Sequence, residues 1–504
     1  MLKWRYLDRY TELSVELVLK NGRIVTPEGV FPGGVAINEG KIVVVAGDPN
    51  LPVGDRTIDV EGKHILPGVV DPHTHPGKRD FATDIMNESS VATIGGTTTM
   101  GAIIKSSRMG SGWSNDPPKQ VSYKETFPAA KKAVEDGALI DIFYNFAIAT
   151  DEQALEIPFY AKEYGVTSYK FYLGYMGGNR ITRRRGLGLF ASRLGIPDGF
   201  DDGTIYLGFE SIGKLGPPCM AHIHAENTFI ARIFFKRILK EGRGDMAGWS
   251  AISPGWLEAI HIRNYAYLAK MTGAPLYVVH INSAEGVDQV LKARADGTEI
   301  YAEANPQHLW IDETQDPPGM YGKLTPPIRD RANNDKLVSA LRDGGIFCMG
   351  TDHVPSMPDD NVGPGFVTED MEVYRGAGGI GMQTHLPSML SEGVNKGRLS
   401  LERTVEVCCK NSAWAAGLYP KKGALIAGAD GDVVVVDMKL TKKVTQETIQ
   451  SKFNAFFRER ELTGWPVMTI LRGNIVFEDG QITGKPGTGK YLPRKLGSQL
   501  YPVS

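Results

Sequence analysis

The stretch 64-HILPGVVDPHTHPG-77 determines the fold that we expect for this chain of 504 residues. It begins with apolar residues and ends with Asp71, His73 and His75. Because alternate side chains of a β-strand point to the same side, the two imidazoles project together from the carboxyl end of a buried strand. Such a pair can be an ordinary polar pair, but two adjacent imidazoles can also coordinate a divalent metal ion.

Segments of strand type alternate with segments of helical type through the middle of the chain. A helical pattern occurs, for example, in 128-PAAKKAVEDG-137. The strand-like segments lie at residues 96–104, 138–148, 167–173, 217–225, 274–281 and 345–353. Repeated strand–helix units of this kind predict an α/β fold, in its simplest form a (β/α)8 TIM-like barrel, which we place at residues 64–417.

Both ends of the chain have the character of an antiparallel sheet. The segment 15-VELVLKNGRIVTPEG-29 contains an Asn-Gly hairpin signal, and strand-like runs return in 431-GDVVVVDM-438. We therefore expect a small, discontinuous β-sandwich domain, built from residues 1–63 and 418–485, beside the barrel. Residues 486–504 are rich in Gly, Pro and Lys and are predicted to form a C-terminal arm or tail.

Composition and charge exclude several classes of partner. Lys plus Arg (56) nearly balances Asp plus Glu (58), so the net charge of −2 predicts neither a nucleic-acid nor an anionic membrane partner. No stretch approaches the roughly 18–20 apolar residues of a membrane span, and the charged beginning of the chain is unlike a signal peptide. The four cysteines suit a reducing compartment, so a cytoplasmic protein is expected.

Three further polar residues end later strands of the predicted barrel: His224, His280 and Asp352. Each histidine taken alone could be an ordinary core residue. In a barrel, however, the carboxyl ends of the strands converge on one axis, where these side chains would meet His73 and His75. Nitrogen and oxygen ligands gathered in this way predict a metal centre in the barrel mouth.

Lys170 is placed unusually for a lysine, because it lies between Tyr169 and Phe171 in a strand-like run. Burial there would lower the pKa of its amine and make the amine reactive. The alternative is a lysine whose charged end extends to solvent from a strand end. A neutral amine beside two metal ions could take up CO2, and the resulting carbamate would bridge the ions.

Other histidines and basic residues permit a functional and a structural interpretation. His222 shares a face with His224 and could replace it as a ligand, but a structural role is favoured. A structural role is also favoured for His308 and His353 over contact with metal ligands. The basic residues Lys78, Arg79, Arg180 and 183-RRR-185 could bind an anionic group of a substrate, although a solvated surface or a subunit contact is favoured for the cluster at 180–185.

Taken together, the motifs resemble the amidohydrolase superfamily, and within it the cyclic-amidase branch of hydantoinase, dihydropyrimidinase and allantoinase. The resemblance covers nearly the whole chain. Its motifs are 71-DPHTHPG-77, 168-SYKFYLGY-175, 224-HAEN-227, 276-LYVVHINSAE-285, 305-NPQHL-309, 324-LTPPIRD-330 and 350-GTDHVP-355.

The resemblance implies two divalent metal ions, usually zinc, and a homotetramer. The implied metal ligands are His73, His75 and Asp352 for one ion, His224 and His280 for the other, and N-carboxylated Lys170 between them. The resemblance also implies that Tyr175 stabilises the developing oxyanion and that the main chain at Thr325 meets the substrate amide.

Such a centre predicts hydrolysis of the C–N bond of a cyclic amide by a metal-bridging hydroxide. Asp352 would accept the proton of this hydroxide and pass it to the leaving nitrogen. The candidate rings are a hydantoin, a dihydropyrimidine, allantoin and a cyclic imide. The alternatives are a deaminase or a hydrolase of another amide or a lactam on the same scaffold, and a non-catalytic dihydropyrimidinase-related scaffold protein. The last of these lacks metal ligands, whereas every ligand position is filled here.

Because of two departures from the family pattern, the resemblance does not identify the substrate ring. Gly77 occupies the position where the dihydroorotase pattern has an arginine for the substrate carboxylate, which argues against that activity. The segment 375-RGAGGIGMQTHLP-387 lacks the asparagine that contacts substrate in hydantoinases and dihydropyrimidinases, and it is closer to the allantoinase pattern. A non-standard cyclic amide or imide is therefore also among the candidates.

Overall fold

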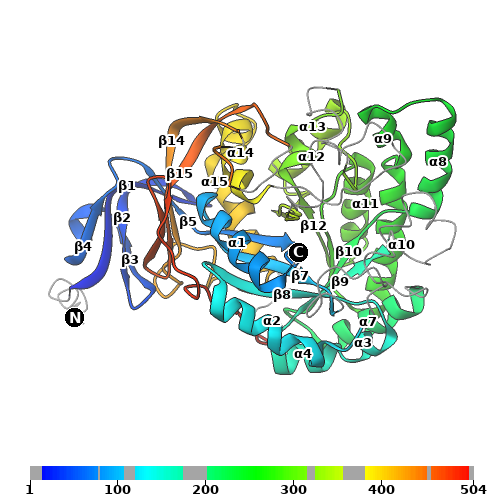
Figure 1. Cartoon of the computed structure of the whole chain (residues 1–504), viewed down its shortest axis with the longest axis horizontal. Coiled ribbons are helices and arrows are strands. Elements are labelled where there is room, and N and C mark those ends of the chain that lie inside the picture. Colours follow the sequence, from blue (N-terminus) through cyan, green and yellow to red (C-terminus); the bar gives the residue numbers. More distant parts are fainter. Residues whose placement is uncertain are drawn as a thin grey trace, which may run out of the picture.

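A computed structural model of the chain describes residues 14–77, 80–106, 120–173, 201–314, 324–355, 381–445, 447–450 and 456–498. These residues form a barrel with surrounding helices and, at one side of it, a sheet domain (Figure 1). Among the described helices, none combines the length and the apolar character that crossing a membrane requires.

The barrel contains eight strands that are hydrogen-bonded in the order of the sequence, each parallel to the next. They are β6 (Val69–Thr74), β7 (Thr97–Ile104), β8 (Asp141–Ala147), β9 (Ser168–Tyr172), β10 (Met220–His224), β11 (Leu276–Val278), β12 (Ile300–Ala304) and β13 (Cys348–Met349). A parallel bridge joins Thr74 at the end of β6 to His353, which follows β13. The last strand thus returns to the first, and the predicted TIM-like barrel is confirmed.

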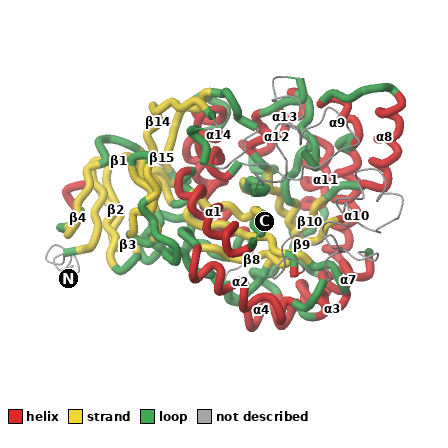
Figure 2. Tube along the Cα trace, in the orientation of Figure 1, coloured by secondary structure: helices red, strands yellow, loops and turns green. Residues whose placement is uncertain are grey.

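Helices lie around the outside of the barrel strands (Figure 2). They are α1 (Phe81–Ile94), α2 (Tyr123–Gly137), α3 (Asp151–Leu155), α4 (Ile157–Tyr164), α7 (Asp202–Leu215), α8 (Thr228–Lys240), α9 (Met246–Ile252), α10 (Trp256–Thr272), α11 (Ala284–Ala295), α12 (Pro306–Trp310), α13 (Arg331–Arg342), α14 (His385–Ser388), α15 (Leu401–Val405) and α16 (Asn411–Ala415). Several begin at a short polar side chain that accepts a hydrogen bond from the first turn, as Asp330 does from the N–H of Asn333 at 2.8 Å. Because both faces of the barrel strands are covered, β7 and β8 are buried at every position.

The two chain ends contribute strands to one domain, as predicted, and all of its described strands belong to a single mixed sheet. In the order of hydrogen bonding this sheet reads β17-β16-β15-β14-β5-β1-β2-β3, and β4 pairs with β1. The strands are β1 (Val15–Thr26), β2 (Gly29–Asn38), β3 (Lys41–Ala46), β4 (Gly54–Asp59), β5 (His64–Pro67), β14 (Val433–Lys443), β15 (Glu461–Leu471), β16 (Asn474–Glu478) and β17 (Gln481–Ile482). Leu19 and Val35 from the first part of the chain share a buried core with Val433 and Ile470 from the last part. The domain boundaries predicted from the sequence stay a prediction; β5, which begins at His64, pairs within this sheet.

A buried ion cluster joins this sheet domain to the barrel. The ammonium group of Lys422, with no exposed side-chain surface, lies 2.6 Å from Asp141 at the start of β8, and 2.9 Å and 2.7 Å from Asp430 and Asp432. Arg472, which follows β15, pairs with the same Asp141. The cluster therefore links the beginning of a barrel strand to the segment before β14 and to the residue that follows β15.

The predicted C-terminal arm lies against the amino ends of the barrel strands. The N–H of Leu492 donates to the carbonyl of Ile142 at 2.8 Å. The guanidinium group of Arg494 is buried and donates to the carbonyl of Tyr144 at 2.6 Å. These contacts are at the end of the barrel opposite to the predicted metal ligands.

Candidate metal centre

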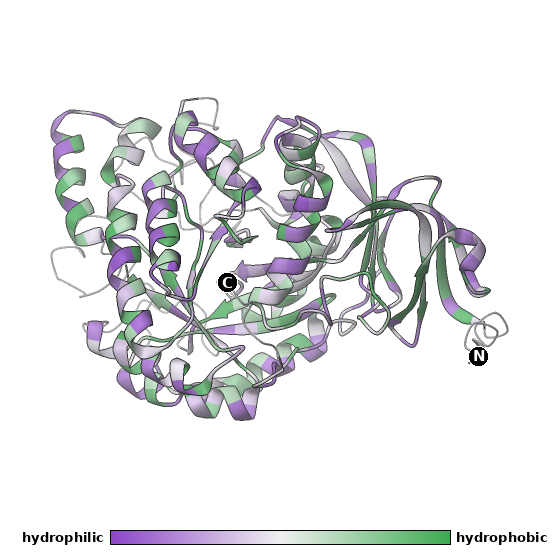
Figure 3. Ribbon diagram, turned by 180° about the vertical axis from the view of Figure 1, so that it is seen from behind, coloured by the Kyte–Doolittle hydropathy of each residue, from purple (hydrophilic) through white to green (hydrophobic). Residues whose placement is uncertain are grey.

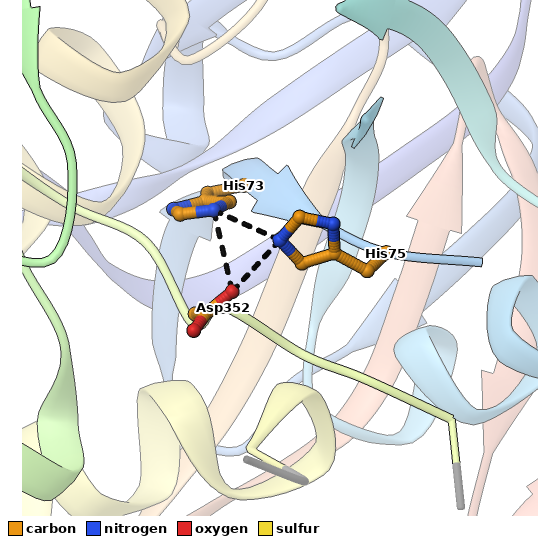
Figure 4. A group of neighbouring side chains, drawn as sticks. All are labelled: His73, His75 and Asp352. Atoms are coloured by element: carbon orange, nitrogen blue, oxygen red, sulfur yellow. Dashed lines mark hydrogen bonds and ion pairs between the residues drawn. The ribbon is translucent and has the colours of Figure 1, made fainter. Parts of the chain in front are cut away.

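His73, His75 and Asp352 come together at the carboxyl end of the barrel (Figure 4). Asp352 Oδ1 lies 2.9 Å from His75 Nε2 and 3.3 Å from His73 Nε2, and the two Nε2 atoms are 3.2 Å apart. His73 and Asp352 are buried, and His75 is partly exposed. One nitrogen of each imidazole and one carboxylate oxygen thus face a common point, which is the arrangement expected of a metal-binding group.

His224, at the end of β10, and His280, just after β11, form a second pair. His224 Nδ1 lies 2.8 Å from His280 Nε2, and both side chains are buried. The ring centroids of His280 and His73 are 5.4 Å apart, so the second pair adjoins the first group. All five residues therefore lie at one end of the barrel, as the convergence of parallel strands predicts.

Lys170 in β9 is completely buried, and its amine has no hydrogen-bond partner among the residues that the structure describes. Burial lowers the pKa of this amine to about 7, although the negative charges of Asp352 and Glu303 oppose the change. After burial, the charge of Lys170 is the next cause that lowers the pKa of His73, and it also lowers the pKa of His280. The amine is therefore within electrostatic reach of both histidine pairs and is predisposed to the neutral, reactive form.

Two of the candidate ligands have a left-handed backbone conformation. The φ angle is 39° at His280 and 52° at Asp352. Side chains other than glycine rarely adopt such angles, which cost about 1–3 kcal/mol each and cluster at functional sites. Here each angle occurs two or three residues after a barrel strand, where the chain turns its side chain toward the axis.

Asp71, singled out with the histidines but without a role, holds together the segments that carry His73 and Asp352. Its carboxylate accepts hydrogen bonds from Thr351 Oγ1 at 2.6 Å, from Thr351 N at 3.1 Å and from His73 N at 3.2 Å. Burial raises the pKa of Asp71 to about 7. The residue therefore supports the site from below rather than entering it.

Two buried glutamates for which the sequence predicted no role contact the candidate ligands. Glu303 Oε1 lies 2.8 Å from His73 Nδ1, and Glu226 Oε2 lies 3.2 Å from His224 Nε2. Burial raises the pKa of Glu303 to about 8. Burial also acts to raise the pKa of Glu226, but the hydrogen bond with His224, the charge of His224 and the contributions of Ser253 and Arg329 together outweigh it, so the pKa of Glu226 is lowered. A carboxylate within or directly after a buried strand was the signal that could have identified both.

The remaining histidines lie beside the centre. The ring of His222 contacts that of Tyr277 at a centroid distance of 4.5 Å, and His224 rather than His222 faces His280. His308 Nε2 lies 3.2 Å from the carbonyl oxygen of Pro326, and His353 pairs with Glu88.

Only one of the two predicted substrate-binding residues lies within the described part of the chain. Thr325 is half-buried and follows Leu324, whose carbonyl accepts a hydrogen bond from Trp249 Nε1 at 2.7 Å. Tyr175 lies outside the described residues. The same is true of the basic residues Lys78, Arg79, Arg180 and Arg183–Arg185, and of most of the segment 375–387.

The residues present fit a centre of divalent metal ions. Imidazole and carboxylate ligands suit zinc and related ions. The ligand atoms of His73, His75 and Asp352 all lie within 4.8 Å of one another. The unpaired, buried amine of Lys170 stands beside them as a polar group that lacks a partner within the described residues.

Comparison with known proteins gives relatives over almost the full length. L-hydantoinase of Paenarthrobacter aurescens is 30% identical over 95% of this chain and 98% of its own length. D-hydantoinase of Geobacillus stearothermophilus is 30% identical over 96% of this chain and 98% of its own length. A family model described as the amidohydrolase family matches residues 277–476.

Comparison with solved structures gives relatives of the same type. The structure of L-hydantoinase (dihydropyrimidinase) from Arthrobacter aurescens, 30% identical, covers 95% of this chain and 100% of its own with a TM-score of 0.82. A dihydropyrimidinase from Brevibacillus agri, 25% identical, covers 95% of this chain and 98% of its own with a TM-score of 0.79. The chain therefore belongs to the amidohydrolase family, among relatives of the hydantoinase and dihydropyrimidinase type.

Proposed function

We propose that this protein is a metal-dependent hydrolase that opens the C–N bond of a cyclic amide, such as a hydantoin, a dihydropyrimidine, allantoin or a cyclic imide. The observation that carries the proposal is the convergence of His73, His75 and Asp352 at the carboxyl end of the barrel. Relatives that are named hydantoinases and match nearly the whole chain support the reaction class.

Two divalent ions, with zinc as the first candidate, would be held by the residues that converge there. We assign His73, His75 and Asp352 to one ion, His224 and His280 to the other, and Lys170, N-carboxylated by CO2, to both. When bound, such ions polarise a carbonyl group and make a water molecule more acidic. The lowered pKa of Lys170 supports its carboxylation, because only the neutral amine reacts with CO2.

Asp352 is the proposed proton carrier. Its Oδ1 atom faces the histidine pair, and its main chain has an uncommon conformation three residues after the end of β13. The carboxylate would accept a proton from the attacking water and deliver it to the ring nitrogen that leaves. Tyr175 is proposed to donate a hydrogen bond to the oxyanion, and the main chain at Thr325 to orient the substrate amide.

We also propose a homotetramer in the cytoplasm. Large apolar side chains are exposed on α8 and α10, and in a monomer they would remain in contact with water: Phe229, Ile233, Trp256, Tyr267 and Met271. The four cysteines are free and buried, which suits a reducing compartment. Light scattering after gel filtration measures the oligomer directly, and a monomer at micromolar concentration would contradict this part of the proposal.

The reaction is tested by a hydrolysis screen. Metal-free protein and protein reconstituted with Zn²⁺ and bicarbonate are incubated with hydantoins, dihydropyrimidines, allantoin and cyclic imides, and with linear amides and lactams as comparison substrates. We expect ring opening of at least one cyclic substrate that depends on zinc. Hydrolysis of linear amides or lactams alone would favour the alternative hydrolase, and a protein that retains no metal would favour the non-catalytic scaffold.

A further inference from the structure

Glu303 in β12 connects the segments that carry His73 and His280. Its side chain is completely buried. Oε1 lies 2.8 Å from His73 Nδ1 and accepts a hydrogen bond from the main-chain N–H of His280 at 3.1 Å. Oε2 accepts a hydrogen bond from the hydroxyl group of Tyr277 at 2.9 Å. One carboxylate thus contacts a side chain from β6 and two groups from the region of β11.

The backbone after β13 passes close to this carboxylate. A Cβ atom at Gly350 would lie 2.7 Å from the carboxyl carbon of Glu303 and 2.8 Å from one of its oxygens. Gly350 precedes Asp352 by two residues, so Glu303 also packs against the segment that positions the third ligand. The glycine is required here for close approach and not for an unusual φ angle.

A second carboxylate stands behind the other histidine pair. His224 directs Nδ1 toward His280, and its Nε2 atom lies 3.2 Å from Glu226 Oε2. The Glu226 side chain is buried as well. Each proposed ion therefore has one histidine whose outer nitrogen meets a buried carboxylate, but the two histidines use opposite nitrogens: Nδ1 in His73 and Nε2 in His224.

A neutral imidazole carries a single N–H, and a carboxylate that accepts it determines which nitrogen keeps its lone pair for a metal. We propose that Glu303 is a positioning residue for both ions: it holds the Nδ1–H of His73, which presents Nε2 to one ion, and it fixes the main chain of His280, a ligand of the other. Glu226 has the corresponding role for His224 alone. This inference rests on the proposed metal centre.

Zinc affinity tests the inference without reference to turnover. Wild-type protein and the variants Glu303→Gln, Glu226→Gln and Tyr277→Phe compete for Zn²⁺ with a chromophoric chelator. Loss of such a carboxylate typically weakens metal binding about 10–100-fold. We expect Glu303→Gln to weaken both ions to this extent and Glu226→Gln to weaken one. Tyr277→Phe, which removes a contact to Oε2 and none to a ligand, should bind both ions as the wild type does.

The outcomes separate this inference from the proposed function. If the wild type binds no zinc, the proposed metal centre itself is wrong. If the wild type binds two ions and Glu303→Gln binds both with unchanged affinity, the centre stands and the role of Glu303 is refuted. Far-UV circular dichroism and the thermal midpoint of each metal-free variant show whether it is folded.

The tautomers give a second measurement on the unaltered protein. In metal-free wild type labelled with ¹⁵N-histidine and held at about pH 9, where the Glu303 carboxyl group is ionised, His73 should carry its proton on Nδ1 and His224 on Nε2, with the signals assigned through His73→Gln and His224→Gln. The ¹⁵N chemical shifts distinguish these forms. A proton on Nε2 of His73 would overturn the inference even if Glu303→Gln lost affinity through misfolding.

Discussion

At the scale of single residues, the site depends on side chains that the barrel forces into contact at a buried end. His73 is kept neutral because burial, together with the nearby charge of Lys170, lowers its pKa well below the usual value. A neutral imidazole is the form that binds metals. The same burial removes Lys170 from solvent, and a charged Lys170 would repel protonated His73 and His280. Conversion of the amine to a carbamate would replace this positive charge with a negative one that can bind metal ions.

We predict that Asp352→Asn lowers kcat about 10²–10⁴-fold, because it removes the proton acceptor. Asparagine tolerates the left-handed φ of 52° at this position, so the variant should fold like the wild type. Asp352→Ala should also lose turnover but adds backbone strain. The measurement is kcat on the substrate found in the screen, together with the thermal midpoint. Wild-type kcat in a folded, metal-loaded Asp352→Asn protein would refute the role of Asp352.

At the scale of elements, the polar residues at the strand ends could be predicted from the sequence, whereas the buried carboxylates that contact them could not. The proposed ligands stand out because a polar residue ends an apolar run, as Asp352 ends 346-IFCMGTD-352. Glu303 gives a weaker signal, because its partners His73 and His280 come from other strands and only the closed barrel brings them to it. Positions with no described structure, such as Tyr175, stay predictions.

The approach of β12 to the end of β13 leads to a prediction for Gly350. Gly350→Ala should displace the Glu303 carboxylate, since a Cβ there lies 2.7 Å from its carboxyl carbon. Overpacking of this kind costs about 1–3 kcal/mol, and zinc affinity should fall with it.

Gly345→Ala is the matched control, because its added Cβ meets Ala340 Cβ at an ordinary 3.4 Å. Urea unfolding of the metal-free variants and zinc competition measure both effects. Equal stability and equal zinc affinity for the two variants would show that the close approach at Gly350 has no consequence.

At the scale of the whole molecule, the barrel and the sheet domain are joined by buried charges as well as by packing. The barrel with a sheet built from both chain ends was predictable, because hairpin signals and apolar runs are local. The ion cluster was not, because Lys422 meets Asp141 across 281 positions of sequence. Figure 3 shows apolar residues concentrated on the strands of both parts, which is the pattern that the sequence revealed.

Replacing Lys422 should show how much its ammonium group contributes to the free energy of unfolding. Lys422→Met leaves Asp141, Asp430 and Asp432 buried without their ammonium partner, which we expect to destabilise the protein by about 3–5 kcal/mol at neutral pH. Burial opposes the charged form of Asp141, but Lys422 and Arg472 outweigh it and lower its pKa. In the wild type, this carboxylate therefore adds stability above its unfolded pKa of about 3.9, and that stability is lost as the pH falls through the lower folded value.

In the variant, the pH dependence of this stability contribution has the opposite sign, because a buried aspartate without a cation has a raised pKa and binds a proton on folding. The difference in unfolding free energy between wild type and variant should consequently shrink from pH 7 toward pH 4. Chemical unfolding at several pH values measures this difference. A constant difference, or no destabilisation at pH 7, would contradict the assigned role of the cluster.

Anomalous diffraction at the zinc edge, from crystals of the zinc-loaded protein, tests directly whether the barrel mouth holds two metal ions. We expect two peaks in the mouth of the barrel, one among His73, His75 and Asp352 and one between His224 and His280, with extra density on the Lys170 amine. A barrel mouth without anomalous signal, in protein that is folded and saturated with zinc, would contradict this expectation.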